Sequence, residues 1–128
     1  YKASSLTSEE QNDIFQNLVA LFETQKKYLE PKVQLQEVAD ALQVSTHRLS
    51  QTINSITGKT FYDFVNGYRV KHLQKLLSEP SNKKFTILAM GLESGFNSKA
   101  SLNRIFKDET GLSPKEYQQK CSANLTEP

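Results

Sequence analysis

Two stretches of this 128-residue sequence carry hydrogen-bond donors without a single carboxylate, residues 45–57 and residues 97–107. Their outward positions are Thr46, His47, Arg48, Ser50, Gln51 and Asn54 in the first stretch, and Ser98, Lys99, Ser101, Asn103, Arg104 and Lys107 in the second. Arginine, lysine, asparagine and glutamine match the guanine and adenine edges in a DNA groove, whereas acidic side chains would repel phosphate. A solvated helix face usually mixes both signs of charge, so this sorting favours a nucleic-acid surface.

The elements that hold these stretches are expected to be helices, because apolar residues recur at helical spacing and no long run alternates with period two. We expect helices over residues 8–29, 35–42, 46–57, 61–77, 87–94 and 98–110, and another from Pro114. The expected N-caps are Thr7, Ser45, Thr60, Thr86, Asn97 and Ser113, and the expected helix ends lie at Gly58, Gly95 and Gly111 and before Pro31 and Pro80. The sequence therefore predicts an all-α fold.

The most informative pattern is an internal repeat. Leu49, Ile53, Thr57, Gly58, Thr60, Phe61 and Phe64 return, 53 residues later, as Leu102, Phe106, Thr110, Gly111, Ser113, Pro114 and Tyr117. Ahead of that block the offset is 52 residues, because Ala39 corresponds to Gly91 and Gln43 to Gly95. The same unit therefore occurs twice, and its second copy has one additional residue in the turn.

Each copy consists of a short helix, a tight turn and a longer helix. A small residue (Ala39 or Gly91) allows the two helices to cross closely, and an apolar residue (Leu49 or Leu102) anchors the second helix. The turn needs a left-handed residue, which suits Gly95 better than Gln43. This order is typical of a helix-turn-helix unit, whose second helix lies in the major groove. A plain bundle of helical hairpins is the alternative for one copy, but two copies in register favour DNA binding.

Composition excludes several classes of protein. Hydrophobic residues make up 37% of the chain, and no apolar run approaches the roughly 18 residues needed to cross a bilayer. Residues 1–42 carry 4 Lys/Arg and 7 Asp/Glu, whereas residues 43–128 carry 12 and 7, so positive charge lies with the repeated units. The two histidines and Cys121 have neither metal-ligand spacing nor a catalytic arrangement. We therefore expect no metal, no cofactor and no enzymatic activity.

The ends and the lone cysteine bear on the cellular context. A single Cys121 cannot form an internal disulfide, which fits a reducing cytoplasm. The first residue is Tyr1 rather than methionine, so we expect a piece of a longer protein. We expect this piece to be cytoplasmic, with the sensor, and a membrane anchor if the protein has one, located ahead of Tyr1.

Over residues 33–119 the sequence resembles the AraC/XylS family of bacterial transcription regulators. The most specific match runs from Gly95-Phe96-Asn97-Ser98-Lys99 through Phe106-Lys107 to Thr110-Gly111-Leu112-Ser113-Pro114-Lys115-Glu116-Tyr117. The first copy matches at Val38-Ala39, Val44-Ser45, Leu49-Ser50, Thr57-Gly58-Lys59-Thr60-Phe61 and Tyr68-Arg69. Departures are Gly91, where the family usually has alanine, and Leu102, where it favours an aromatic residue. The resemblance implies two homeodomain-like helix-turn-helix subdomains joined by a long helix.

The resemblance also implies which residues contact DNA. The positions that match family base readers are His47, Ser50 and Gln51 in the first unit, and Lys99, Ala100, Ser101 and Arg104 in the second. Phosphate contacts are expected from Thr46, Arg48, Asn54, Thr60, Asn97, Ser98 and Lys107. Ala100 cannot donate a hydrogen bond, so it would contact a thymine methyl group.

The expected domain organisation follows from these matches. Residues 1–32 are expected to form a linker or coupling helix that can be removed without loss of DNA affinity. Residues 33–119 form the double helix-turn-helix domain (33–60, a connecting helix over 61–78, and 85–119), and residues 120–128 a tail. The expected partners are double-stranded DNA, RNA polymerase and an upstream sensor domain, and we expect no small-molecule site in this segment.

Several readings stay open. The helical pairs could instead form a protein-interaction module without DNA binding, or belong to a DNA-repair enzyme, although no activated cysteine supports the latter. Arg104 could grip phosphate or pair with Asp108 rather than read a base, and His47 could contact phosphate. Arg69 is expected to tie the two subdomains together rather than touch DNA, and His72 and Cys121 to be inert.

Overall fold

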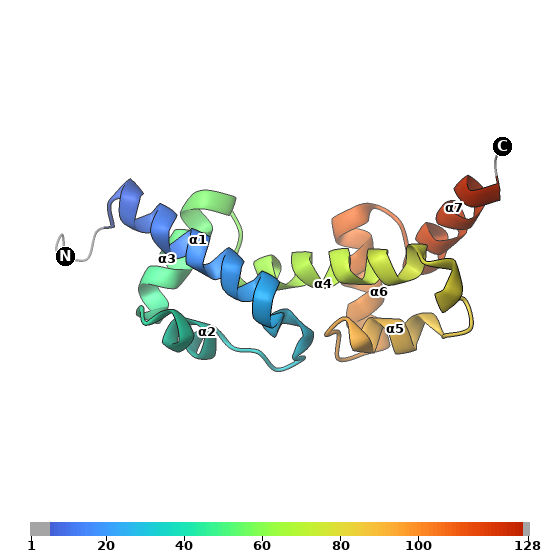
Figure 1. Cartoon of the computed structure of the whole chain (residues 1–128), viewed down its shortest axis with the longest axis horizontal. Coiled ribbons are helices and arrows are strands. Elements are labelled where there is room, and N and C mark those ends of the chain that lie inside the picture. Colours follow the sequence, from blue (N-terminus) through green and yellow to red (C-terminus); the bar gives the residue numbers. More distant parts are fainter. Residues whose placement is uncertain (1–5, 127–128) are drawn as a thin grey trace. The chain divides into compact units, whose positions relative to one another are not determined.

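The computed structural model describes residues 6–126, and every regular element within that range is a helix (Figure 1). The elements are α1 (Ser8–Gln25), η2 (Lys27–Leu29), α2 (Leu35–Leu42), α3 (Thr46–Thr57), α4 (Phe61–Ser78), η3 (Pro80–Asn82), α5 (Ile87–Glu93), α6 (Lys99–Thr110) and α7 (Pro114–Thr126), where η denotes a 3₁₀ turn. The all-α prediction is confirmed. No helix in this described range has the length and hydropathy needed to span a bilayer.

The chain divides between Val65 and Asn66 into two compact units, which we call the N-terminal and the C-terminal unit. Helix α4 begins in the first and continues into the second. The segment expected as a tail from residue 120 continues α7 to Thr126. Tyr1, from which we argued for a longer protein, lies outside the described residues.

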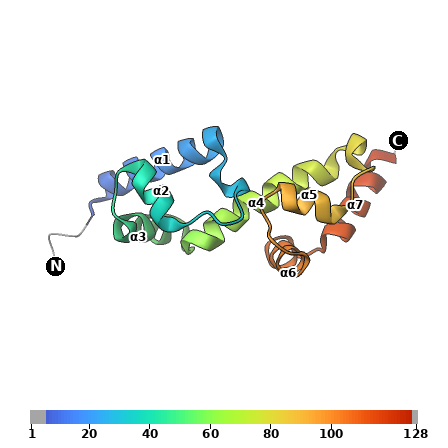
Figure 2. The same cartoon turned by 90° about the horizontal axis from the view of Figure 1, so that it is seen from below.

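In the N-terminal unit, α1 forms because its first turn is capped and one face is apolar. Thr7 and Glu10 make the expected capping box, with Glu10 N donating to Thr7 Oγ1 at 3.0 Å and Thr7 N donating to Glu10 Oε1 at 2.9 Å. Helix α1 lies alongside α2 and α3 (Figures 1 and 2), and its residues Ile14, Leu18 and Phe22, spaced by four, are buried. Helix α1 therefore completes the core of the first helix-turn-helix.

The structure bears on two expectations about this region. The first helix was expected to reach Leu29, but it ends at Gln25 because Lys26 adopts a left-handed conformation (φ 51°), and a 3₁₀ turn follows. We also expected residues 1–32 to be separate from the DNA-reading unit. In the structure α1 packs against the helix-turn-helix, and its Phe22 ring lies 5.6 Å from that of Phe64 at the start of α4.

The core of the C-terminal unit joins α4, α5 and α6. It consists of Val70, Leu73, Leu77, Met90, Phe96, Leu102 and Phe106. Tyr117 of α7 packs edge-on against Phe106, with ring centroids 5.7 Å apart. A Cβ atom at Gly91 would lie 2.7 Å from Leu102 Cδ2, so glycine permits the close crossing of α5 and α6 that the sequence predicted.

The internal repeat extends further than the sequence indicated. Helices α1 and α4 both have 18 residues, α3 and α6 both have 12, and each pair is offset by 53 residues. A 3₁₀ turn follows the first helix of each set, also at an offset of 53. Each unit therefore contains a set of three helices in the same order, and the helix expected to be a linker is the first of the set in the N-terminal unit.

Candidate nucleic-acid interface

The turn between the two helices of each pair has the same hydrogen-bond pattern in both units. Val44 N donates to Ala39 O at 3.0 Å, and Phe96 N donates to Gly91 O at 3.1 Å. The residue ahead of each donor has positive φ, 59° at Gln43 and 102° at Gly95, as the repeat predicted. This pattern is the Schellman arrangement that ends a helix and redirects the chain.

After the turn, the extra residue of the second unit can be located. Helix α3 is capped by Ser45, whose side chain accepts from Arg48 N at 3.1 Å. Helix α6 is capped by Ser98, whose side chain accepts from Ser101 N at 3.1 Å. The prediction that Asn97 caps this helix was therefore wrong: Asn97 is the inserted residue, and the cap lies at the position equivalent to Ser45.

One face of helix α3 is buried in the N-terminal unit, and the opposite face is exposed to solvent. Leu49, Thr52 and Ile53 are buried, so the helix cannot turn without exposing its core. Among the predicted base readers, His47 and Ser50 are exposed and Gln51 is half-buried. Gln51 lies two residues from both Leu49 and Ile53, about 200° around the helix from each, and therefore on the outward face.

Helix α6 is anchored in the same way by Leu102 and Phe106, which are buried. Lys99, Ala100 and Arg104 are exposed. Arg104 is two residues from each anchor, about 200° around the helix, and so occupies the position equivalent to Gln51. Within the described part of the chain Arg104 makes neither an ion pair with Asp108 nor a hydrogen bond, which leaves its guanidinium available to a ligand.

Ser101 differs from the other predicted base readers because its hydroxyl is already engaged. Its Oγ accepts from Ser98 Oγ at 3.0 Å and donates to Asn97 Oδ1 at 3.1 Å, and the residue is half-buried. These bonds fix the first turn of α6. Ser101 and Asn97 thus contribute to the position of the helix in addition to the DNA contacts expected of them.

Sequence reasoning placed Asn103 on the polar face of the second helix but not among the base readers, although the repeat contained the signal. Asn103 lies 53 residues after Ser50, at the same place on the recognition helix, and it is exposed. An asparagine amide can form two hydrogen bonds with adenine. It belongs with the candidate base readers.

The predicted phosphate contacts fall into two groups by exposure. Thr46 and Arg48 are half-buried, whereas Asn54, Thr60, Asn97, Ser98 and Lys107 are exposed. Thr60 caps α4, since its Oγ1 accepts from Asp63 N at 3.2 Å, so its hydroxyl, like that of Ser98, is partly committed to a helix start. The long side chain of Lys107 is the most accessible cation of this set.

A groove of about 640 Å³ lies beside α6, between α5 and the start of α7. Lys99, Asn103 and Lys107, spaced by four residues, form one wall, and Lys115 lies on another. Its lining combines these three lysines with the apolar residues Ile87, Leu88, Leu102 and Pro114 and includes no carboxylate, so the lysines at its walls can attract a phosphate.

Arg69 and His72 lie in α4, and both take part in hydrogen bonds within the C-terminal unit. Arg69 is buried, its Nη1 donates to Asn66 Oδ1 at 3.0 Å, and burial lowers the pKa of its guanidinium. His72 Nδ1 lies 3.0 Å from the buried Ser94 Oγ, which itself donates to Met90 O at 2.9 Å. His72, expected to be inert, thus links α4 to α5.

Cys121 is half-buried on α7 near Tyr117, whose pKa is raised first by burial and then by the thiol. No cluster of three or more His, Cys, Asp or Glu side chains suited to a metal occurs among residues 6–126.

Comparison with known proteins agrees with this geometry. A family of helix-turn-helix domains matches residues 38–120. Proteins described as uncharacterized HTH-type transcriptional regulators from Staphylococcus aureus strains COL and N315 are each 32% identical over 84 residues, which cover 66% of this chain but 11% of those proteins.

Solved structures share the fold. The C-terminal domain of AraT, a response regulator from Geobacillus stearothermophilus, has a TM-score of 0.68 at 24% identity and covers 91% of this chain and 88% of its own. An AraC-type transcriptional regulator from Chromobacterium violaceum has a TM-score of 0.74 at 17% identity, covering 87% of this chain and 94% of its own. This chain belongs to the AraC-type helix-turn-helix family, a DNA-binding, non-enzymatic class of transcription regulators.

Proposed function

We propose that the chain binds double-stranded DNA at specific sequences, with α3 and α6 each inserted into a major groove. The observation that carries the proposal is that both helices are anchored through the same frame and expose donor-rich faces. His47 and Ser50 are exposed on α3, as are Asn103 and Arg104 on α6. Such side chains can distinguish base pairs by their groove edges.

In this proposal each of the two helices contacts the bases of a different DNA segment. His47, Ser50 and Gln51 read bases from α3, and Lys99, Ala100, Ser101, Asn103 and Arg104 read them from α6. Arg104 is assigned to guanine, because a guanidinium can donate two parallel hydrogen bonds that a lysine cannot match. Asn103 is assigned to adenine and Ala100 to a thymine methyl group.

Phosphate contacts position the helices in the grooves. We assign them to Thr46, Arg48, Asn54, Thr60, Asn97, Ser98 and Lys107. Backbone N–H groups at the starts of α3 and α6 add donors, because the first turn of a helix leaves them without intrahelical partners. The lysine-lined groove beside α6 extends this contact along one strand.

We further propose that the chain is the output end of a longer regulator. It spans 11% of the length of the curated relatives that it matches, and the AraT fragment is the C-terminal domain of a response regulator. An upstream sensor would then control access to DNA, and RNA polymerase would be the downstream partner.

The test is selection from a random duplex library with the 128-residue chain, followed by titration of the enriched sequences. We expect a motif with two separated boxes, one lost when His47, Ser50 and Gln51 are replaced by alanine and the other lost when Asn103 and Arg104 are replaced. Equal binding to every sequence would refute specific reading. Absence of binding at low salt would favour the protein-interaction alternative.

A further inference from the structure

An exposed tyrosine, Tyr62, lies in the first turn of α4, directly after the first helix-turn-helix. It is 54% exposed, and its ring packs edge-on against that of the buried Phe61, with the ring centroids 5.2 Å apart. Its hydroxyl makes no hydrogen bond within the described part of the chain. The ring is therefore supported on one side, while its polar end is available to a ligand.

The repeat identifies the counterpart of Tyr62 in the C-terminal unit. Thr57 Oγ1 and Thr110 Oγ1 each accept from the backbone N–H two residues later, at 3.1 Å in both units. The glycine that follows each threonine has positive φ, 74° and 81°. The next helix is capped in each unit by a hydroxyl that accepts from the N–H three residues later, at 3.2 Å and 3.1 Å. All these pairs are 53 residues apart, so Tyr62 corresponds to Lys115.

Lys115 lies in the groove beside α6, together with Lys99 and Lys107. At the same offset, the positions beside α3 carry neutral side chains with hydrogen-bond donors, Thr46, Asn54 and Tyr62. The fold therefore accepts either an ammonium group or a neutral polar group at each of these three places. In the N-terminal unit none of the three can neutralise a phosphate.

The charge of the two units differs in the same direction. Residues 1–65 carry 6 Lys/Arg and 8 Asp/Glu, whereas residues 66–128 carry 10 and 6. A unit with an excess of acidic residues is not drawn to DNA by its net charge. Hydrogen bonds from neutral side chains are the contacts that remain available to it, and tyrosine is one of the residues that donate to phosphate oxygens.

On the basis of the proposed DNA binding, we propose that Tyr62 contacts the DNA backbone beside α3, in the place that Lys115 takes beside α6. The phenol O–H donates to a phosphate oxygen, and the ring covers the adjacent deoxyribose. Because this contact leaves the phosphate charge in place, it releases no counterion. The DNA segment read by α3 is thus bound with a weaker dependence on salt than the segment read by α6.

The experiment is titration of a selected duplex with the 128-residue chain at several salt concentrations. Tyr62→Ala should weaken binding about tenfold, the scale of a hydrogen bond to a charged group, without changing the salt slope. Tyr62→Phe keeps the ring but lacks the hydroxyl, so it should lose most of the same affinity. Tyr62→Lys should raise the salt slope by about one counterion, and Lys115→Tyr should lower it by about one.

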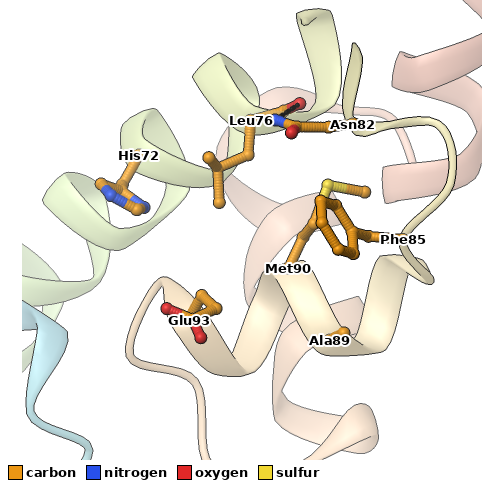
Figure 3. A pocket seen from close by; sticks show the side chains of 7 residues that line it. All are labelled: His72, Leu76, Asn82, Phe85, Ala89, Met90 and Glu93. Atoms are coloured by element: carbon orange, nitrogen blue, oxygen red, sulfur yellow. Dashed lines mark hydrogen bonds between the residues drawn. The ribbon is translucent and has the colours of Figure 1, made fainter. Parts of the chain in front are cut away.

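Phe85 supplies the matched control, because it is also an exposed aromatic residue, at 48%. It lines a different groove, of about 440 Å³, whose lining residues belong to α4, η3, α5 and the loop between them. Figure 3 shows Phe85 among these residues, which include Leu76 and Met90. Phe85→Ala should leave both the affinity and the salt slope unchanged.

Circular dichroism verifies that each variant remains folded, and Tyr62→Lys tests the same position if Tyr62→Ala does not. An unchanged affinity of folded Tyr62→Ala would overturn the Tyr62 contact. So would an unchanged salt slope of Tyr62→Lys, because the position would then lie away from the phosphates. The proposed function is tested separately, since loss of one box on replacing His47, Ser50 and Gln51 does not depend on Tyr62.

Discussion

The two units share a frame but differ in what they present. Both contain a long helix, a 3₁₀ turn and a helix-turn-helix, with caps and chain reversals at matching positions. On the recognition helices, however, α6 exposes Lys99, Arg104 and Lys107, whereas α3 has a single half-buried arginine, Arg48. The same frame therefore forms with different outward residues in the two units.

The largest expected effect concerns α1, which we first took for a dispensable linker. Deleting residues 1–30 should unfold the N-terminal unit and abolish specific DNA binding, because it removes Leu18, Phe22 and Tyr28 from the core. Phe22→Ala should cost about 3–5 kcal/mol, the usual range for a buried aromatic side chain. Circular dichroism and chemical denaturation would measure both. The exposed neighbour Glu23→Ala is the control, and a folded deletion variant with intact affinity would restore the linker interpretation.

The next largest effect is on DNA affinity and sequence preference, and we expect it to be larger at Arg104 than at its counterpart Gln51. Arg104→Ala should weaken binding to the selected site by about 1–3 kcal/mol and relax preference at one base pair. Gln51→Ala should relax a base pair in the other box by a smaller amount, since Gln51 is half-buried. Arg104→Lys keeps the charge but not the paired donors, so it should lose the preference while retaining part of the affinity. Equal weakening on all sequences would assign Arg104 to phosphate.

At Lys107 we expect a comparable loss of DNA affinity that does not depend on the DNA sequence. Lys107→Ala should weaken binding to every sequence alike and lower the salt dependence by about one counterion. Lys120→Ala removes the same charge from the exposed surface of α7 and should change neither quantity. Titrations at several salt concentrations would measure the slope. A changed sequence preference in Lys107→Ala would move this residue to the base readers.

At the helix crossing we expect a smaller loss of stability in both units, with a different physical cause in each. Ala39→Gly should destabilise by about 1 kcal/mol through helix propensity. Gly91→Ala should also destabilise, by about 1–2 kcal/mol, because crowding against the buried Leu102 exceeds the gain in propensity. Combining Gly91→Ala with Leu102→Val should cost less than the sum of the single changes. Strict additivity in denaturation experiments would show that the close approach carries no strain.

The smallest effect concerns pH. Hydrogen bonds from the backbone N–H of Thr7 and of Ser113 lower the pKa of Glu10 and Glu116, respectively, below 4.5. Since the folded-state pKa is the lower one, these bonds stabilise above the unfolded-state pKa and are lost as pH falls through the folded value. Glu10→Gln and Glu116→Gln should each make helicity less sensitive to acid between about pH 5 and pH 3. An unchanged acid titration would exclude these boxes as contributors.

Much of the fold could be predicted because its signals are local. Thr7, Ser45, Thr86 and Ser113 cap helices as expected, and Gly58 and Gly111 end them, since each uses a hydrogen bond across two to four residues. The spacing of Leu49, Leu102 and Phe106 likewise identified the anchors of the recognition helices. Asn97 was misassigned because either Asn97 or Ser98 could cap by residue type. Only the backbone path shows that Ser98 N-caps α6.

The sequence by itself determined the helices, the repeat, the polar faces of α3 and α6, and the family. Tertiary structure alone decided the role of α1, because no shared residues mark its match with α4: Ile14, Leu18 and Phe22 do not recur at an offset of 53. It also decided which hydroxyls already make hydrogen bonds within the chain, as at Ser101, and where a groove forms, as between Leu76 and Met90. Capping hydrogen bonds join residues that are close in the sequence, so the sequence can predict them. A groove forms where side chains that are distant in the sequence leave space between helices, so only the tertiary structure shows it.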